Sequence, residues 1–138
     1  MTNAELIQEA KKARERAYVP YSHHSVGAAL VTKKGKIYHG CNIENAAYGP
    51  SNCAERTAFF RAVYDGERDF DKIAVVGGME GTDGNMLCAP CGVCRQVMME
   101  FCNPETFKIV LADGPDKQIE YTLKDLLPLG FGPGNLEK

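Results

Sequence analysis

The stretch KIAVVG, residues 72–77, is the strongest strand candidate in the sequence, and it lies between two stretches with helical periodicity. Before it, apolar residues recur at helical spacing from Cys53 to Tyr64, and Gly66 is a natural stop for that helix. After it, Pro90 precedes a second helical pattern, whose apolar members are Val93, Val97, Met98 and Phe101. A buried strand flanked by two such helices is typical of an α/β domain.

Further helix and strand patterns extend this alternation along the chain. Thr2 and Glu5 have the form of a capping box before a first amphipathic helix, whose pattern reaches Ala17 and is stopped by Pro20. The other predicted elements are strands over 26–31, 37–42, 107–111 and 118–121, and a last short helix capped by Thr122 with Asp125. The tail 130–134 is too rich in glycine and proline for regular structure. The order predicts a three-layer α/β/α sandwich with a central mixed five-stranded sheet.

Length and charge bound the function. At 138 residues the chain predicts one domain, residues 1–138. Sixteen Lys and Arg against eighteen Asp and Glu give a net charge of −2, so no basic field is available for nucleic acid or an anionic membrane. No apolar run approaches the ~20 residues of a membrane span, and the charged N-terminus lacks a signal-peptide core. The sequence therefore predicts a cytoplasmic protein without a nucleic-acid or membrane partner.

Six cysteines stand out in a chain with no sign of secretion, where clustered cysteines more often bind metal or do chemistry. Cys91 and Cys94 are two residues apart at a predicted helix start, and Cys53 begins another helix. A helix N-terminus supplies free N–H groups and a positive dipole that stabilise thiolates. Two parallel βα units would place both helix starts at one sheet edge and bring the three thiolates together. Three cysteines leave the fourth tetrahedral position of a zinc ion open, as a catalytic site requires.

Two other interpretations of these cysteines stay open on spacing alone. A lone C-x-x-C also fits a redox dithiol or a non-catalytic zinc-binding module, and Cys41, Cys88 or Cys102 could supply a fourth ligand. Glu55 favours catalysis, because it can reach the open position without coordinating the metal, and a carboxylate there can move a proton to a substrate nitrogen. By itself, a Glu in a first helical turn is a dipole partner.

Cys53-Ala54-Glu55 followed by Pro90-Cys91-x-x-Cys94 resembles the zinc-dependent nucleoside deaminases, a superfamily with a three-cysteine variant. The similarity extends over nearly the whole chain to the small tetrameric cytidine deaminases. The segments that carry it are 21–22 with 26–30, 40–46, 53–58, 90–97, and 126–128 with Phe131.

The resemblance implies an enzyme that deaminates cytidine and 2′-deoxycytidine by hydrolysis and releases ammonia, as in pyrimidine salvage. It implies one Zn²⁺ per chain, with Glu55 as the proton shuttle and with Cys53, Cys91 and Cys94 as ligands. Arg56 stands where the family has an arginine that donates hydrogen bonds to the ligand thiolates. The alternative substrate is another cytosine nucleoside such as blasticidin S. A polynucleotide substrate is disfavoured by the charge of −2, since single-strand binding needs a basic groove.

The resemblance also implies how the substrate is held. Asn42 and Glu44 match residues that contact the ribose 3′-hydroxyl, a neutral group that does not need Lys or Arg. Backbone groups of Ala54 are implied in base recognition. Residues that complete a neighbouring subunit's pocket in a homotetramer with shared active sites are matched by Ala46, Tyr48 and Phe131.

One position departs from the family pattern. His24 stands in a segment where the family usually has a phenylalanine. A neutral imidazole can stack on a pyrimidine but buries less apolar area and can titrate. We expect His24 to bind the base more weakly and to give activity a pH dependence.

Overall fold

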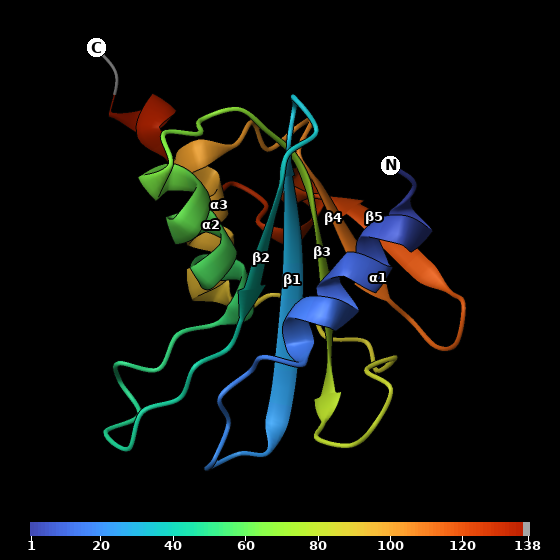
Figure 1. Ribbon diagram of the computed structural model, residues 1–138. Helices are drawn as coiled ribbons and strands as arrows, with labels where there is room; N and C mark the ends of the chain where they lie inside the picture. Colours follow the sequence, from blue (N-terminus) through green and yellow to red (C-terminus); the bar gives the residue numbers. More distant parts are fainter. Residues whose placement is uncertain (137–138) are drawn as a thin grey trace.

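Five strands form one mixed sheet in the computed structural model of the protein, which describes residues 1–136 (Figure 1). The strands lie in the order β2-β1-β3-β4-β5. β1 is antiparallel to both β2 and β3, β3 is parallel to β4, and β4 is antiparallel to β5. Their bounds are β1 His24–Thr32, β2 Ile37–Cys41, β3 Phe70–Met79, β4 Lys108–Ala112 and β5 Gln118–Thr122. The mixed five-stranded sheet is as predicted.

Helices cover both faces of this sheet. Helix α1, Asn3–Arg14, lies across one face, while α2, Ala54–Tyr64, and α3, Gly92–Phe101, lie side by side on the other (Figure 1). A short helix α4, Leu123–Leu126, follows β5, and it is capped by Thr122 and Asp125 as predicted. The predicted three-layer α/β/α sandwich is confirmed.

Each face has its own hydrophobic core. The larger cluster lies under α2 and α3 and is centred on Phe59, which packs edge-on against Phe70 at 5.1 Å between ring centroids. The cluster under α1 is built from smaller residues, such as Leu6 and Ala10 of the helix and Val76 of the sheet. Burying a large apolar side chain stabilises the fold by about 1.5–3 kcal/mol, so the side under α2 and α3 contributes the most.

Two glycines let helices rest directly on the strand backbone. A Cβ at Gly27 of β1 would lie 2.1 Å from the Ala10 carbonyl oxygen of α1, and a Cβ at Gly40 of β2 would lie 2.2 Å from the Ala54 carbonyl oxygen of α2. Any larger residue at either position must push its helix away. Gly40 therefore sets the height of the first turn of α2 above the sheet.

The strand directions explain why α2 and α3 begin at the same edge. β2 and β3 are both antiparallel to β1, so they run in the same direction, and the helix after each starts at the same end of the sheet. This confirms the expected meeting of the two helix starts. The two strands are not neighbours, because β1 lies between them.

A few boundaries differ from the sequence prediction. Helix α1 ends at Arg14, before Ala17, and β3 is longer than 72–77 at both ends. The tail was predicted to lack regular structure, which is wrong for Pro133–Asn135. These residues form a short 3₁₀ helix, because a proline at the first position is already set for a helical turn. Within residues 1–136, no helix is both long and apolar enough to cross a membrane.

Candidate metal centre and active site

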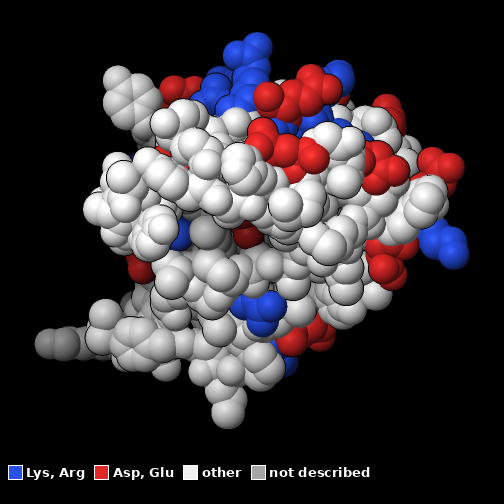
Figure 2. All heavy atoms as spheres, turned by 90° about the horizontal axis from the view of Figure 1, so that it is seen from below, with Lys and Arg blue, Asp and Glu red and all other residues white. Residues whose placement is uncertain are grey.

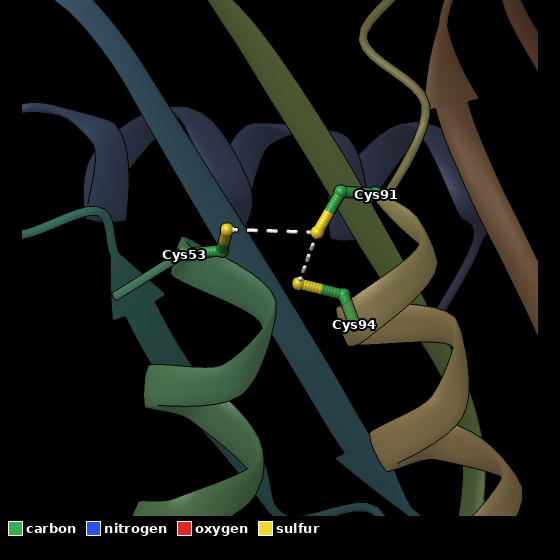
Figure 3. A group of neighbouring side chains, drawn as sticks. All are labelled: Cys53, Cys91 and Cys94. Atoms are coloured by element: carbon green, nitrogen blue, oxygen red, sulfur yellow. Dashed lines mark hydrogen bonds between the residues drawn. The ribbon is translucent and has the colours of Figure 1, made fainter. Parts of the chain in front are cut away.

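Three cysteine thiols meet where α2 and α3 begin. Cys53 is the N-cap residue of α2, Cys91 is the N-cap residue of α3, and Cys94 lies in the first turn of α3. Their side chains point toward one another from the two helix starts (Figure 3). The Cys91 sulfur lies 3.8 Å from that of Cys53 and 3.5 Å from that of Cys94. The predicted cluster of three cysteines is therefore present in the fold.

The spacing of the sulfurs fits a tetrahedral zinc ion. A Zn–S bond of about 2.3 Å places two ligands of a tetrahedron about 3.8 Å apart, which matches the measured separations. No other His, Cys, Asp or Glu of residues 1–136 joins the group of three, so the fourth position is left to a non-protein ligand. Cys41, Cys88 and Cys102, the other candidates, remain free thiols outside it. The donor set is that of an open zinc site.

Arg56 supplies positive charge beside the thiols. Its Nη2 donates to the Cys53 sulfur at 3.2 Å, as the resemblance implied. The pKa of Cys53 falls to about 5, because the Cys94 thiol donates a hydrogen bond to it and the guanidinium lies alongside. The same hydrogen bond raises the pKa of Cys94. The buried Nε of Arg56 has no partner among residues 1–136, so the guanidinium retains one unused donor at the site.

Glu55 is the one carboxylate buried within residues 1–136, with 4% of its surface exposed. It follows Ala54, the first residue of α2, and so lies two residues after Cys53 in the first helical turn. Burial raises the pKa of Glu55 to about 7, and the charge of Cys53 adds to the effect. A carboxyl group that titrates near neutrality can both accept and release a proton at physiological pH.

Asn42 and Glu44 organise the loop segments around the site. The Asn42 side chain accepts from the Val26 N–H and donates to the His24 carbonyl, both at 2.9 Å. Glu44 accepts from the N–H groups of Tyr21 and Ser22 at 3.1 Å, and from the Ser22 hydroxyl. The bonds from Ser22 lower the pKa of Glu44. Because an amide and a carboxylate hold more hydrogen bonds than these, both side chains retain capacity for a ligand.

The remaining predicted binding residues divide into two groups. Ala54 is fully buried, and His24 is half-buried at the start of β1, opposite Met79. Those exposed on segments outside the core are Ala46, Tyr48 and Phe131. The C-terminal stretch lies at the opposite end of the molecule from the loop of residues 42–52 (Figure 1). The chain thus gathers its thiols, Glu55 and Arg56 by itself, and the exposed residues point away from its core.

The face that carries this loop is hollowed near its centre, and uncharged side chains cover most of it (Figure 2). A separate cavity of about 270 Å³ lies beside the loop and is lined by Tyr21, Ser22, Glu44, Tyr48 and Ser51. The rings of Tyr21 and Tyr48 meet edge-on, with centroids 6.2 Å apart. The surroundings suit a small uncharged ligand better than a polyanion.

Ser22 and Gly40 contribute to the site but were not among the predicted site residues. Ser22 holds Glu44, and the signal for it was its place in the Tyr21-Ser22 pair that carries part of the resemblance. Gly40 places the start of α2, and one glycine at the end of a short strand gave no signal of that contact.

Comparison with known proteins identifies the family. The family model described as the cytidine and deoxycytidylate deaminase zinc-binding region matches residues 1–110. The chain belongs to this family. Zinc is therefore the metal cofactor, the three-cysteine cluster could hold it, and the resemblance inferred from the motifs is confirmed.

The relatives agree over almost the whole length. A cytidine deaminase of Sporosarcina psychrophila is 53% identical over 131 residues, which cover 95% of this chain and 92% of the relative. The crystal structure of cytidine deaminase from Burkholderia pseudomallei matches with a TM-score of 0.85 at 52% identity, covering 95% of this chain and 100% of the other. A blasticidin-S deaminase of Bacillus cereus is 32% identical over 130 residues, 92% of this chain and 90% of the relative.

Proposed function

We propose that the protein is a cytidine deaminase that hydrolyses cytidine and 2′-deoxycytidine to uridine and 2′-deoxyuridine, with release of ammonia. In a cell this is a reaction of pyrimidine salvage. The observation that carries the proposal is the buried Glu55 beside three thiols that leave one metal position open. A non-catalytic zinc-binding module has no use for a carboxylate at that place.

Glu55 is proposed to move the protons of the reaction. Its carboxylate accepts a proton from the attacking water and delivers it to N3 of the cytosine ring. The second water proton then passes through Glu55 to the departing amino group, which leaves as ammonia. A pKa of about 7 suits a group that must take up and release a proton in each turnover.

Zinc bound by Cys53, Cys91 and Cys94 supplies Lewis-acid activation of the attacking water. Three thiolates on a divalent ion leave a net charge of −1, which weakens that activation. The hydrogen bond from Arg56 to the Cys53 sulfur withdraws charge from the ligand set and offsets part of this loss. Arg56 is thus proposed as a residue that tunes the metal.

The polar groups around the site support a nucleoside substrate. Asn42 and Glu44 are proposed to bind the ribose 3′-hydroxyl with the hydrogen-bonding capacity that their loop contacts leave free. A carboxylate beside the sugar repels a phosphate, so a nucleotide is disfavoured. Backbone groups of Ala54 and the imidazole of His24 are proposed to contact the base.

We propose a homotetramer that shares its active sites. Large apolar side chains are exposed in three places. The exposed fraction is 72% for Tyr48 in the loop of residues 42–52, 90% for Tyr64 at the end of α2, and 56% for Phe131 in the C-terminal segment. Scattered apolar residues are common on monomers, but so many on protruding segments suit burial by another subunit. The residues proposed to reach a neighbouring pocket are Ala46, Tyr48 and Phe131.

Residues 1–138 are proposed to form one catalytic domain, which acts in the cytoplasm. All six cysteines are free thiols in the structure, although three of them lie close together. Free thiols of this kind suit a reducing compartment, where disulfides are rare.

Blasticidin S is the second candidate substrate. The similarity to a blasticidin-S deaminase supports it, since the same metal site serves any cytosine nucleoside. The Asn42-Ile43-Glu44 segment, which is proposed to read an unmodified ribose, favours cytidine.

The test combines zinc analysis with absorbance assays on cytidine, deoxycytidine, CMP and blasticidin S. We expect one zinc per chain, rapid conversion of both nucleosides and slow or absent conversion of CMP. Preference for blasticidin S would select the second candidate. Metal-replete protein that forms no uridine would overturn the proposal.

A further inference from the structure

Arg95 connects three parts of the chain that meet beside the metal ligands. Its Nε donates to the Pro90 carbonyl at 2.8 Å, and its Nη1 donates to the Leu126 carbonyl at 2.7 Å. Its own backbone N–H donates to the Cys91 carbonyl at 3.0 Å. The side chain is half-buried, so these charged hydrogen bonds are shielded in part from water.

These bonds bracket Cys91 on both sides. Cys91 is exposed, and it ends the long connection from β3 to α3, in which residues 80–91 contain neither helix nor strand. The residue before it is Pro90, which has no N–H, so the Pro90 carbonyl is that residue's only backbone group for anchoring the peptide. Arg95 holds this carbonyl with its side chain and the Cys91 carbonyl with its main chain. Arg95 therefore holds the backbone directly before and directly after the Cα of Cys91.

The other arm of Arg95 reaches the C-terminal segment. Leu126 is the last residue of α4, and the chain continues from it to Phe131. The next residue of α3, Gln96, donates from its side chain to the Phe131 carbonyl at 2.7 Å. Two consecutive residues of α3 thus hold both ends of the segment 126–131. One guanidinium joins this segment to the peptide that precedes a zinc ligand.

We propose that Arg95 is a positioning residue that couples zinc retention at Cys91 to the order of the C-terminal segment 126–131. Holding the Pro90 carbonyl keeps the Cys91 sulfur in place for the metal. Because the same guanidinium also holds the Leu126 carbonyl, its position depends on whether the C-terminal segment is ordered. The inference rests on the zinc site of the proposed function, but it does not depend on which substrate is deaminated.

The first test measures how fast the folded, zinc-loaded protein gives up its metal to an excess of a chromogenic chelator. Groups that orient metal ligands change metal affinity by about 10–100-fold, so we expect Arg95→Gln to release zinc at least about 10-fold faster. Arg95→Lys can hold one carbonyl at a time, so its rate of zinc release should lie between those of the wild type and Arg95→Gln. Arg68→Gln is the matched control, because Arg68 also donates to two backbone carbonyls, those of Val63 and Glu67, at the far end of α2. It should release zinc at the wild-type rate.

The second test measures amide hydrogen exchange of residues 127–131 with and without zinc. Coupling is reciprocal, so removing zinc should speed this exchange in the wild type and have little effect in Arg95→Gln. Gln96→Ala should loosen the segment at Phe131. By the same reciprocity it should also speed zinc release, by less than Arg95→Gln does.

Zinc release from folded Arg95→Lys and Arg95→Gln at the wild-type rate would overturn the inference, as would exchange of 127–131 that ignores zinc in the wild type. If Arg95→Gln does not fold, Arg95→Lys decides the first test and the wild-type exchange decides the second. Protein that passes both tests and forms no uridine would contradict the proposed function and leave this inference standing.

Discussion

The two faces of the sheet carry helices that begin differently and have different uses. At the start of α1, the Thr2 side chain accepts from the Glu5 N–H at 3.1 Å, and the Glu5 carboxylate accepts from the Thr2 N–H at 3.0 Å. At the starts of α2 and α3 the N-cap residues are Cys53 and Cys91, and neither side chain caps its helix. At a helix start with a capping box, the side chains are already used in hydrogen bonds to the backbone. One that carries uncapped thiols is open to a metal.

The arginines of the two faces repeat this contrast. Arg14, at the end of α1, donates to the carbonyls of four residues, Ser25, Gly78, Met79 and Thr82, at 2.8–3.1 Å. Arg56, in α2, donates to a sulfur and keeps its Nε without a partner among residues 1–136. The first guanidinium fixes a loop to the sheet. The Arg56 guanidinium keeps one donor that is available at the site.

The largest expected effect is on kcat, and it should follow removal of the glutamate Glu55 on α2 but not of Glu9 on α1. Glu55→Gln should lower kcat for cytidine by about 10²–10⁴-fold, the range for loss of a general acid–base group, while zinc content stays at the wild-type level. Glu9→Gln, on α1, removes a carboxylate that bonds Lys12 and His39 and should leave kcat unchanged. Steady-state assays with metal analysis check both. Loss of zinc in Glu55→Gln would instead make Glu55 a ligand.

Metal binding should depend on Cys53, Cys91 and Cys94 and on no other cysteine. Cys53→Ser should weaken zinc binding by at least about 100-fold, because losing a ligand exceeds the roughly 10–100-fold effects of groups that orient ligands. Cys41→Ser is the control, since the Cys41 thiol donates to the Arg16 carbonyl at 3.4 Å, away from the cluster. Competition with a chelator of known affinity measures both. Equal zinc loss in Cys53→Ser and Cys41→Ser would contradict the assignment of Cys53, but not Cys41, as a zinc ligand.

The pH dependence of stability should have opposite signs on the two faces in the metal-free protein. Burial raises the pKa of Glu55 from 4.5 to about 7, so its contribution is complete below pH 4.5 and is lost as the pH rises through 7. Glu55→Gln should remove this loss, which reaches about 3 kcal/mol at about 1.4 kcal/mol per pKa unit. The pKa of Glu9 is lowered by Lys12 and His39, so its contribution is lost as the pH falls. Denaturant unfolding of the wild type, Glu55→Gln and Glu9→Gln from about pH 3 to about pH 8 gives the sign.

The smallest effect is expected on the α1 face. Arg14→Gln leaves carbonyls without their charged donor and should lower the free energy of unfolding by about 2 kcal/mol. Zinc content and kcat should not change, because the contacts of Arg14 are with backbone carbonyls of β1, β3 and the turn that follows β3. Arg16→Gln, two residues along and exposed, is the control for loss of charge. A change in zinc content would mean that the faces are not independent.

Local rules were enough to predict most of the fold. The capping boxes of Thr2 and Thr122, the KIAVVG strand and the cysteines at helix starts all follow from residue type and spacing. The strand order was beyond such rules, because β1 pairs not only with the adjacent β2 but also with β3, which is distant in the sequence. The end of α1 was missed since alanines kept a helical spacing beyond the point where Arg14 turns to the sheet.

The site was predicted less evenly. The three thiols and Glu55 have chemistry that their spacing announces, and the structure places them together. Asn42 and Glu44 could be named only by resemblance, and no pattern showed that they also hold the loops of Val26 and Ser22. The bracketing of Cys91 by Arg95 depends on a proline carbonyl, which sequence spacing does not reveal.

The placement of β1 between the two strands that precede the ligand-bearing helices has a consequence for how the metal is acquired. Cys53 and Cys91 are 38 residues apart in the chain. In an unfolded chain, closing a loop of that length costs about 4 kcal/mol of entropy before the two sulfurs can share an ion. Pairing of β1 with both β2 and β3 brings the starts of α2 and α3 to one edge, so strand hydrogen bonds hold this loop closed. The free energy of zinc binding therefore does not have to supply this loop-closure entropy.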